Sequence, residues 1–165
     1  MVLENFTSGY DVANGSIIAT GETNDCTVRA IANAFNVCYD VAHDYAKVIF
    51  GRENRKGIRG FAMLLGAVKT VSFNQTSGQL DLFEQSSKYS VKSLSQSQLI
   101  NTSYKHKKVK WTVKTFCAKH NRGTYIITVK GHALTIKDGI ILDNPHFRFT
   151  GFRRPVLGAF KIARK

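Results

Sequence analysis

The chain has 165 residues, 43% of them hydrophobic, with eleven phenylalanines and only two prolines. This length and composition predict a single folded domain over 1–165 and exclude a largely disordered chain. No stretch approaches the ~20 apolar residues of a membrane span. The N-terminal region lacks the basic start and apolar run of a secretory signal. Three widely spaced cysteines suit a reducing compartment, so we expect a cytoplasmic protein without a membrane partner.

The formal net charge of +13 is concentrated in the second half of the chain. Residues 1–84 carry seven Lys and Arg against nine Asp and Glu, whereas residues 85–165 carry seventeen against two. Such a surface attracts polyanions, although a solvated basic surface without a specific partner fits the composition equally well. The partners it predicts are nucleic acid or an acidic host protein. The candidate binding residues are Lys105, Lys107, Lys108, Lys110, Arg153 and Arg154.

The first two thirds of the chain predict helices at three places. Residues 1–20 are expected to be an irregular lead-in with a short strand near 16–19. Apolar residues at helical spacing predict helices over 25–35, 40–50 and 60–68, and Asn24 or Asp25 is expected to cap the first of them. The polar stretch near 74–104 is rich in Ser, Gln and Asn, which favours a surface insertion that could include one strand.

The last third predicts a short helix and then an antiparallel sheet. The helix covers 113–120, and β-type runs follow at 124–129, 132–136 and 139–143, with a final strand over 156–162. Asp138 and Gly139 between two of these runs form a strong hairpin signal. Helices first and an antiparallel sheet last is an α+β pattern, with the N-terminal helices packed on the C-terminal sheet.

Three residues on these elements combine into a pattern typical of cysteine nucleophiles. Cys26 follows a polar approach and opens the first long helix, where the helix N-terminus and a nearby imidazolium would stabilise its thiolate. His132 begins one strand and Asp143 ends the next, so the hairpin can place a carboxylate behind the imidazole. Each residue alone has a commoner structural explanation. Together they favour acyl-transfer chemistry, whereas Asp138 in the turn is assigned no chemical role.

The other reactive side chains are expected to be structural. We interpret Cys38 and Cys117 as packing residues and His43 as a surface residue. Trp111 lies among lysines and could stack on a base, although core packing is the commoner fate of a single tryptophan. Cys117 and His120 have half of a zinc-site spacing without a second pair, so we expect neither a metal nor a cofactor.

Three segments, at 24–32, 51–57 and 123–143, resemble a group of small phage and bacterial proteins with a papain-like cysteine-peptidase fold. That group is similar to the bacteriocin leader peptidases. The resemblance covers about 25–60 and 112–143 and leaves out the Ser-rich middle. It implies a helix bearing Cys26 packed against a twisted antiparallel sheet bearing His132 and Asp143. A phage product would act in the host cytoplasm, with packaging in a virion also possible.

The same resemblance implies a thiol hydrolase that acts on a protein or peptide. Cys26 would attack the carbonyl of a peptide, isopeptide or side-chain amide bond, His132 would serve as base and then acid, and Asp143 would orient the imidazole. Such enzymes usually carry a glutamine before the cysteine as an oxyanion donor, and no glutamine precedes Cys26 here. Losing one such donor costs about 10²–10³ in rate.

A side chain before Cys26 is therefore expected to replace the missing glutamine as oxyanion donor. Asn24 is our first choice, with Thr20 and Thr23 as alternatives, each acting beside the backbone N–H of Cys26. The alternative to an enzyme is a weakly active or inactive papain-like fold whose basic half binds nucleic acid or an acidic host protein.

Overall fold

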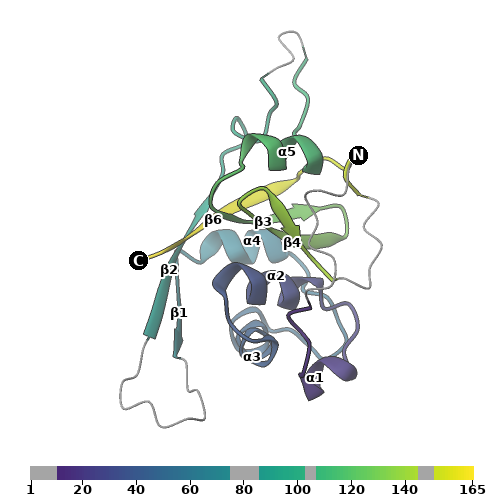
Figure 1. The fold of residues 1–165 in the computed structure, drawn as a ribbon, viewed down its shortest axis with the longest axis vertical. Coiled ribbons are helices and arrows are strands. Elements are labelled where there is room, and N and C mark those ends of the chain that lie inside the picture. Colours follow the sequence, from purple (N-terminus) through teal and green to yellow (C-terminus); the bar gives the residue numbers. More distant parts are fainter. Residues whose placement is uncertain (1–10, 75–85, 103–106, 145–150) are drawn as a thin grey trace.

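A computed structural model describes residues 11–74, 86–102, 107–144 and 151–165. These residues form helices and an antiparallel sheet, which confirms the α+β class (Figure 1). The helices are α1 (Ile17–Thr20), α2 (Cys26–Phe35), α3 (Tyr39–Phe50), α4 (Phe61–Ala67) and α5 (Val113–Lys119). The strands are β1 (Thr70–Asn74), β2 (Ser86–Ser93), β3 (Thr124–Val129), β4 (His132–Lys137), β5 (Ile140–Leu142) and β6 (Gly158–Arg164).

The sheet separates two layers of helices. Its strand order is β1-β2-β6-β3-β4-β5, and every neighbouring pair is antiparallel. Helices α2 to α4 lie on one side of the sheet and α5 on the other (Figure 1). Successive strand side chains point to opposite faces, so Ile126 and Ala133 pack in the cluster with α2, whereas Ile127 and Leu134 pack in the cluster with α5.

Helix α2 is the central element of the larger cluster. All of its residues after Cys26 are buried, which is the pattern of a helix enclosed by protein on every side. It ends at Asn36, whose left-handed backbone (φ 53°) stops the helix. The hydroxyl of Thr135 in β4 donates a 2.7 Å hydrogen bond to the carbonyl of Ala30. This bond fixes the helix that begins with Cys26 against the strand that begins with His132.

The β4–β5 hairpin forms at the predicted dipeptide. Asp138 and Gly139 both have positive φ, 49° and 79°, as a tight hairpin turn requires. The carboxylate of Asp138 accepts a 2.8 Å hydrogen bond from the Gly123 N–H, so its role is structural. The register pairs Thr135 with Leu142. If it continued, Asp143 would lie diagonally across from His132.

One prediction about secondary structure is wrong, and a second, the surface insertion near 74–104 with room for one strand, is wrong about where that strand lies. Residues 17–20 form a helical turn instead of a strand, because the Ser16 hydroxyl accepts a hydrogen bond from the Ala19 N–H (3.1 Å). The stretch near 74–104 contributes β2, which is hydrogen-bonded to both β1 and β6 and is therefore an interior strand. The rest of that stretch lies partly outside the described residues. The final strand begins at Gly158, two residues later than expected.

Of the predictions for Cys117, Trp111, Cys38 and His43, two are confirmed and two are wrong. Cys117 and Trp111 are buried in the cluster with α5, as expected. Cys38 is exposed at the start of α3, and His43 is buried, so both of those predictions are wrong. His43 can be buried because Glu22, from a distant segment, supplies an oxygen 3.1 Å from its Nε2. Among the described residues, no helix has the length and apolar character to cross a membrane.

Candidate active site

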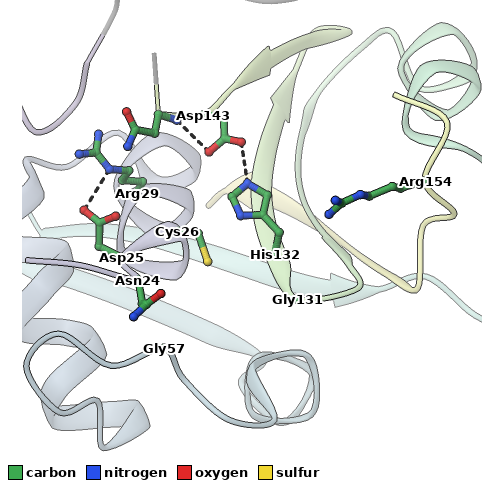
Figure 2. Close-up of a pocket in the computed structure, with 10 residues that line it drawn as sticks. Asn24, Asp25, Cys26, Arg29, Gly57, Gly131, His132, Asp143 and Arg154 are labelled. Atoms are coloured by element: carbon green, nitrogen blue, oxygen red, sulfur yellow. Dashed lines mark hydrogen bonds and ion pairs between the residues drawn. The ribbon is translucent and has the colours of Figure 1, made fainter. Parts of the chain in front are cut away.

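Cys26 and His132 lie in the same cavity at one end of the sheet. The cavity has a volume of about 460 Å³ and is lined by residues from α2, the hairpin before β4, the segment after β5 and the loop before β6. Cys26 is half-buried at the first position of α2, and its sulfur points toward the side of the cavity where His132 lies (Figure 2). The residues that line the cavity are Asn24, Asp25, Cys26, Arg29, Gly57, Gly131, His132, Asp143, Asn144 and Arg154.

His132 and Asp143 form a hydrogen-bonded pair. The Nε2 of His132 lies 2.6 Å from Oδ2 of Asp143, and the other carboxylate oxygen accepts a 2.8 Å hydrogen bond from the Asn144 N–H. The Asp143 side chain is only 2% exposed and the imidazole 13% exposed, so water screens the pair weakly. Since Nε2 is hydrogen-bonded to the carboxylate, Nδ1 is the ring nitrogen that can interact with Cys26.

The surroundings of His132 favour its protonated form. Burial by itself lowers the pKa of the imidazole. Hydrogen bonds to Asp143 and Cys26, together with the negative charges of both groups, outweigh burial and raise the pKa of His132 to about 9. At neutral pH the group beside Cys26 is therefore an imidazolium, which stabilises a thiolate.

The first turn of α2 has no side-chain cap. Asp25 occupies the N-cap position, but its side chain makes no capping hydrogen bond, contrary to the predicted cap. Its Oδ2 instead accepts hydrogen bonds from Arg29 Nε (3.0 Å) and the Tyr39 hydroxyl (2.9 Å). The Asp25 charge is thus balanced by Arg29. Because the N-terminal N–H groups of a helix have no intrahelical acceptor, the Cys26 N–H can serve as a donor to an anion.

Of the three side chains predicted as oxyanion donors, only Asn24 lines the cavity. The hydroxyl of Thr20 donates to Ile17 O (2.6 Å) and that of Thr23 to Arg55 O (3.2 Å), and neither residue lines the cavity. Asn24 does line it, although its amide also donates to Arg55 O (3.2 Å). One amide hydrogen of Asn24 remains, so its role as an oxyanion donor stays a prediction.

A buried ionic network holds the loop at 51–57 against the segment that leads to Cys26. The Glu22 carboxylate accepts hydrogen bonds from Arg52 Nη2 (2.7 Å) and the Arg55 N–H (2.9 Å), and it lies 3.1 Å from His43 Nε2. Burial raises the pKa of Glu22, but these hydrogen bonds outweigh burial and lower it to about 2. The network therefore positions Gly57, which lines the cavity. Sequence reasoning missed it because its members lie up to 33 residues apart.

A second cavity adjoins the first at Cys26 and His132. It has a volume of about 400 Å³ and is largely apolar, with Ile58, Phe61 and Leu157 among its lining residues. Cys26 and His132 line both cavities. They therefore lie between the first cavity, called the polar chamber because charged and amide side chains line it, and the second, apolar cavity. The glycines that also line both are Gly57 and Gly131.

The predicted basic residues come together in space. Lys107, Lys108 and Lys110 are exposed just before α5, and Arg153 and Arg154 are exposed just before β6. Backbone pairing of Thr112 with Pro155 places the two groups side by side. Lys105 lies outside the described residues. Arg154 alone of these residues lines the cavity with Cys26, which the sequence did not indicate.

The described part of the chain contains no cluster of three or more His, Cys, Asp or Glu side chains placed to hold a metal ion. The candidate site therefore consists of the side chains of Cys26, His132 and Asp143. No family model, curated protein or solved structure matches this chain.

Proposed function

We propose that this protein is a papain-like thiol hydrolase that cleaves a peptide, isopeptide or side-chain amide bond. The observation that carries the proposal is the shared cavity of Cys26, His132 and Asp143, in which the carboxylate holds the imidazole by a 2.6 Å hydrogen bond. A thiol, a base within its reach and a third group that orients the base are the parts of an activated cysteine nucleophile.

The first half of the reaction would form a thioester on Cys26. With the pKa of His132 raised to about 9, the group beside the Cys26 thiol at neutral pH is an imidazolium, whose positive charge favours the thiolate as nucleophile. The thiolate attacks the carbonyl carbon, and the oxyanion accepts hydrogen bonds from the Cys26 N–H and, as a second donor, Asn24. The imidazolium then gives its Nδ1 proton to the amide nitrogen, the C–N bond breaks and an amine leaves.

The second half would hydrolyse the thioester. His132, now neutral, takes a proton from water as the water oxygen attacks the thioester carbonyl. The C–S bond breaks, a carboxylic acid leaves, and the thiolate–imidazolium pair is restored. Asp143 keeps the ring orientation and favours its charged form throughout, without itself taking the proton.

Alkylation by iodoacetamide tests the activation of Cys26, because the chain contains two internal control thiols. Cys38 is exposed, and burial raises the pKa of the Cys117 thiol to about 12. The reaction is run at a pH about two units below the ordinary cysteine pKa. There we expect the alkylation rate of Cys26 to be at least about tenfold that of Cys38, measured by peptide mass spectrometry. Equal rates at Cys26 and Cys38 would reject the proposal.

Hydrolysis itself can be tested with a peptide mixture from a digested proteome. New termini identified by mass spectrometry should appear with the wild-type protein and fall by about 10³-fold or more in Cys26→Ser, as for loss of a nucleophile. Folding of the variant is checked by circular dichroism. Cleavage that persists in Cys26→Ser would contradict the assignment of the nucleophile.

A second candidate function is favoured by the joined basic surface of Lys107, Lys108, Lys110, Arg153 and Arg154. This surface could bind nucleic acid or an acidic host protein in a papain-like fold without hydrolysis. The two functions differ in their dependence on Cys26, since binding through exposed lysines does not require a thiol.

A further inference from the structure

Arg154 differs from the other basic residues because it lines the cavity that contains Cys26 and His132. Its side chain extends toward His132 from the side opposite Cys26 (Figure 2). Its backbone is held at both ends: the N–H donates to Gly151 O (2.8 Å), and the carbonyl accepts from the Val113 N–H at the start of α5 (3.1 Å). The arginine is thus presented to the cavity by a fixed backbone.

The other charged side chains around this cavity are balanced within the protein. Arg29 is paired with Asp25, and His132 with Asp143. Arg154 is exposed, and no carboxylate of the described residues forms an ion pair with it. One positive charge of the polar chamber is therefore left for a ligand.

The two cavities beside Cys26 differ in what they could accept. Apart from Cys26 and His132, the apolar cavity has no ionisable lining residue. A carboxylate placed there would lose hydration, which is costly, and would meet no cation except His132, which is already paired with Asp143. The polar chamber has a guanidinium, which binds carboxylates through paired N–H groups, and the exposed lysines nearby add to the positive potential.

We propose that Arg154 binds a carboxylate of the substrate on the polar side of Cys26, so that the protein acts on acidic substrates. The inference rests on the proposed thiol hydrolysis and adds the substrate class. The carboxylate could belong to an acidic side chain next to the cleaved bond or to a C-terminal residue. Both present the same group to the guanidinium.

Three iodoacetyl probes distinguish these sources. Iodoacetyl-glutamate α-amide carries a side-chain carboxylate, iodoacetyl-glutamine carries an α-carboxylate, and iodoacetyl-glutamine amide carries neither. Each is reacted with the full chain at low ionic strength, and the alkylation rates of Cys26 and Cys38 are measured by mass spectrometry. The quantity compared is the Cys26 rate with each acidic probe divided by the rate with the neutral probe.

We expect at least one acidic probe to alkylate Cys26 roughly tenfold faster than the neutral probe, the size of effect that one charge-assisted contact gives. The preferred probe identifies the source of the carboxylate. Arg154→Gln should remove the preference and Arg154→Lys should keep part of it. Arg122→Gln is the matched control. Arg122 is also an exposed arginine, but it precedes the start of β3, at the end of that strand away from His132, so this substitution should leave the ratio unchanged.

Failure of this inference is separable from failure of the proposed function. If Cys26 reacts fast with the neutral probe but its ratios are the same in wild type and Arg154→Gln, the carboxylate site is wrong and the thiol chemistry stands. If Cys26 reacts no faster than Cys38 with the neutral probe, activation is wrong. The ratio still tests Arg154 in that case, since it can be measured on a slowly reacting thiol.

Discussion

The two nitrogens of His132 have different neighbours, and this difference defines the chemistry open to the ring. Nε2 binds a carboxylate that is itself held by the Asn144 N–H, so the imidazole cannot rotate without breaking a buried hydrogen bond. Nδ1 is left on the side of Cys26. A fixed ring orientation matters because proton transfer to a leaving amine requires the donor at hydrogen-bond distance.

Replacing Asp143 by Asn tests what holds the His132 charge. The substitution keeps the side-chain shape but removes the negative charge that raises the imidazole pKa to about 9. Because burial then acts with less opposition, we expect the pKa of His132 to fall in Asp143→Asn, measured by an NMR titration of the ring protons. At neutral pH more of the imidazole is then uncharged, so alkylation of Cys26 should slow.

His120 is the internal reference for that titration. Burial and the nearby charges of Lys119 and Lys161 lower its pKa, and Asp143 is not among these causes. The His120 titration should therefore be the same in both proteins. An unchanged His132 titration in Asp143→Asn would mean that the carboxylate does not hold the imidazolium.

At the scale of elements, the site depends on how α2 meets the β3–β4 hairpin. The hydroxyl of Thr135, which is fully buried, donates to Ala30 O and joins the two elements directly. The hairpin turn before His132 contains Gly131 in a left-handed conformation (φ 73°). Neither the Thr135 hydrogen bond nor the Gly131 turn involves Cys26. Both nevertheless help to determine where His132 lies relative to Cys26.

Thr135→Val should destabilise the fold by about 1–3 kcal/mol, because Val matches the shape of Thr but leaves a buried carbonyl with one hydrogen bond fewer. Thr135→Ser is the matched control, since it keeps the hydroxyl and removes only a methyl group. The free energy of unfolding in urea measures both. If Thr135→Ser is the more destabilised of the two, packing and not the hydrogen bond joins the elements.

Gly131→Ala should slow alkylation of Cys26 as well as cost about 1–2 kcal/mol of stability, the price of a side chain in left-handed backbone. Gly15→Ala is the control, because Gly15 has a similar φ of 82° and, like Gly131, has open space around it, but lies outside both cavities at Cys26. Equal effects of the two variants on alkylation would show that the turn does not position His132.

Sequence patterns predicted the elements best where the determinants are local. Asp138 and Gly139 fixed the hairpin that brings His132 and Asp143 together, since turn chemistry depends on two adjacent residues. One strand was allowed in the stretch near 74–104, but the interior position of β2 was not expected, because its pairing with the distant strand β6 leaves no local signal.

The surroundings of the site required the tertiary structure. Asp25 was expected to cap α2, but its carboxylate has better partners in Arg29 and Tyr39, and Tyr39 belongs to the next helix. His43 was expected at the surface because its partner, Glu22, lies 21 residues away. A short-range pattern cannot indicate which distant side chain will satisfy a buried polar group.

At the scale of the molecule, the fold gathers charge next to the cavity. Pairing of the segments before α5 and β6 joins two basic groups that are distant in the sequence. Several acidic residues of the first half, among those that the structure describes, instead form ion pairs near α2 and the loop at 51–57, such as those of Asp25 and Glu22. The molecule therefore presents a positive face beside the cavity that contains Cys26 and His132.

Salt dependence distinguishes the alternative binding function from the enzymatic one. If the basic face binds nucleic acid, affinity for a labelled DNA duplex should fall steeply with salt, with a log–log slope of about −0.9 for each phosphate contacted. Replacing Lys107, Lys108 and Lys110 by Gln should reduce that slope, whereas Cys26→Ala should not change it. Fluorescence anisotropy measures the affinity. An affinity that does not change with salt would exclude nucleic-acid binding by this face.

The position of β6 has a consequence for the order in which the protein can assemble. This strand is near the C-terminus, yet it lies between β2 and β3 and joins the two halves of the sheet. A ribosome releases Cys26 long before Gly158, so the nascent chain carries a thiol whose supporting sheet is still divided. If the proposed thiol hydrolysis is correct, it requires translation of residues 158–164 to be finished, which would limit premature proteolysis or self-cleavage during synthesis.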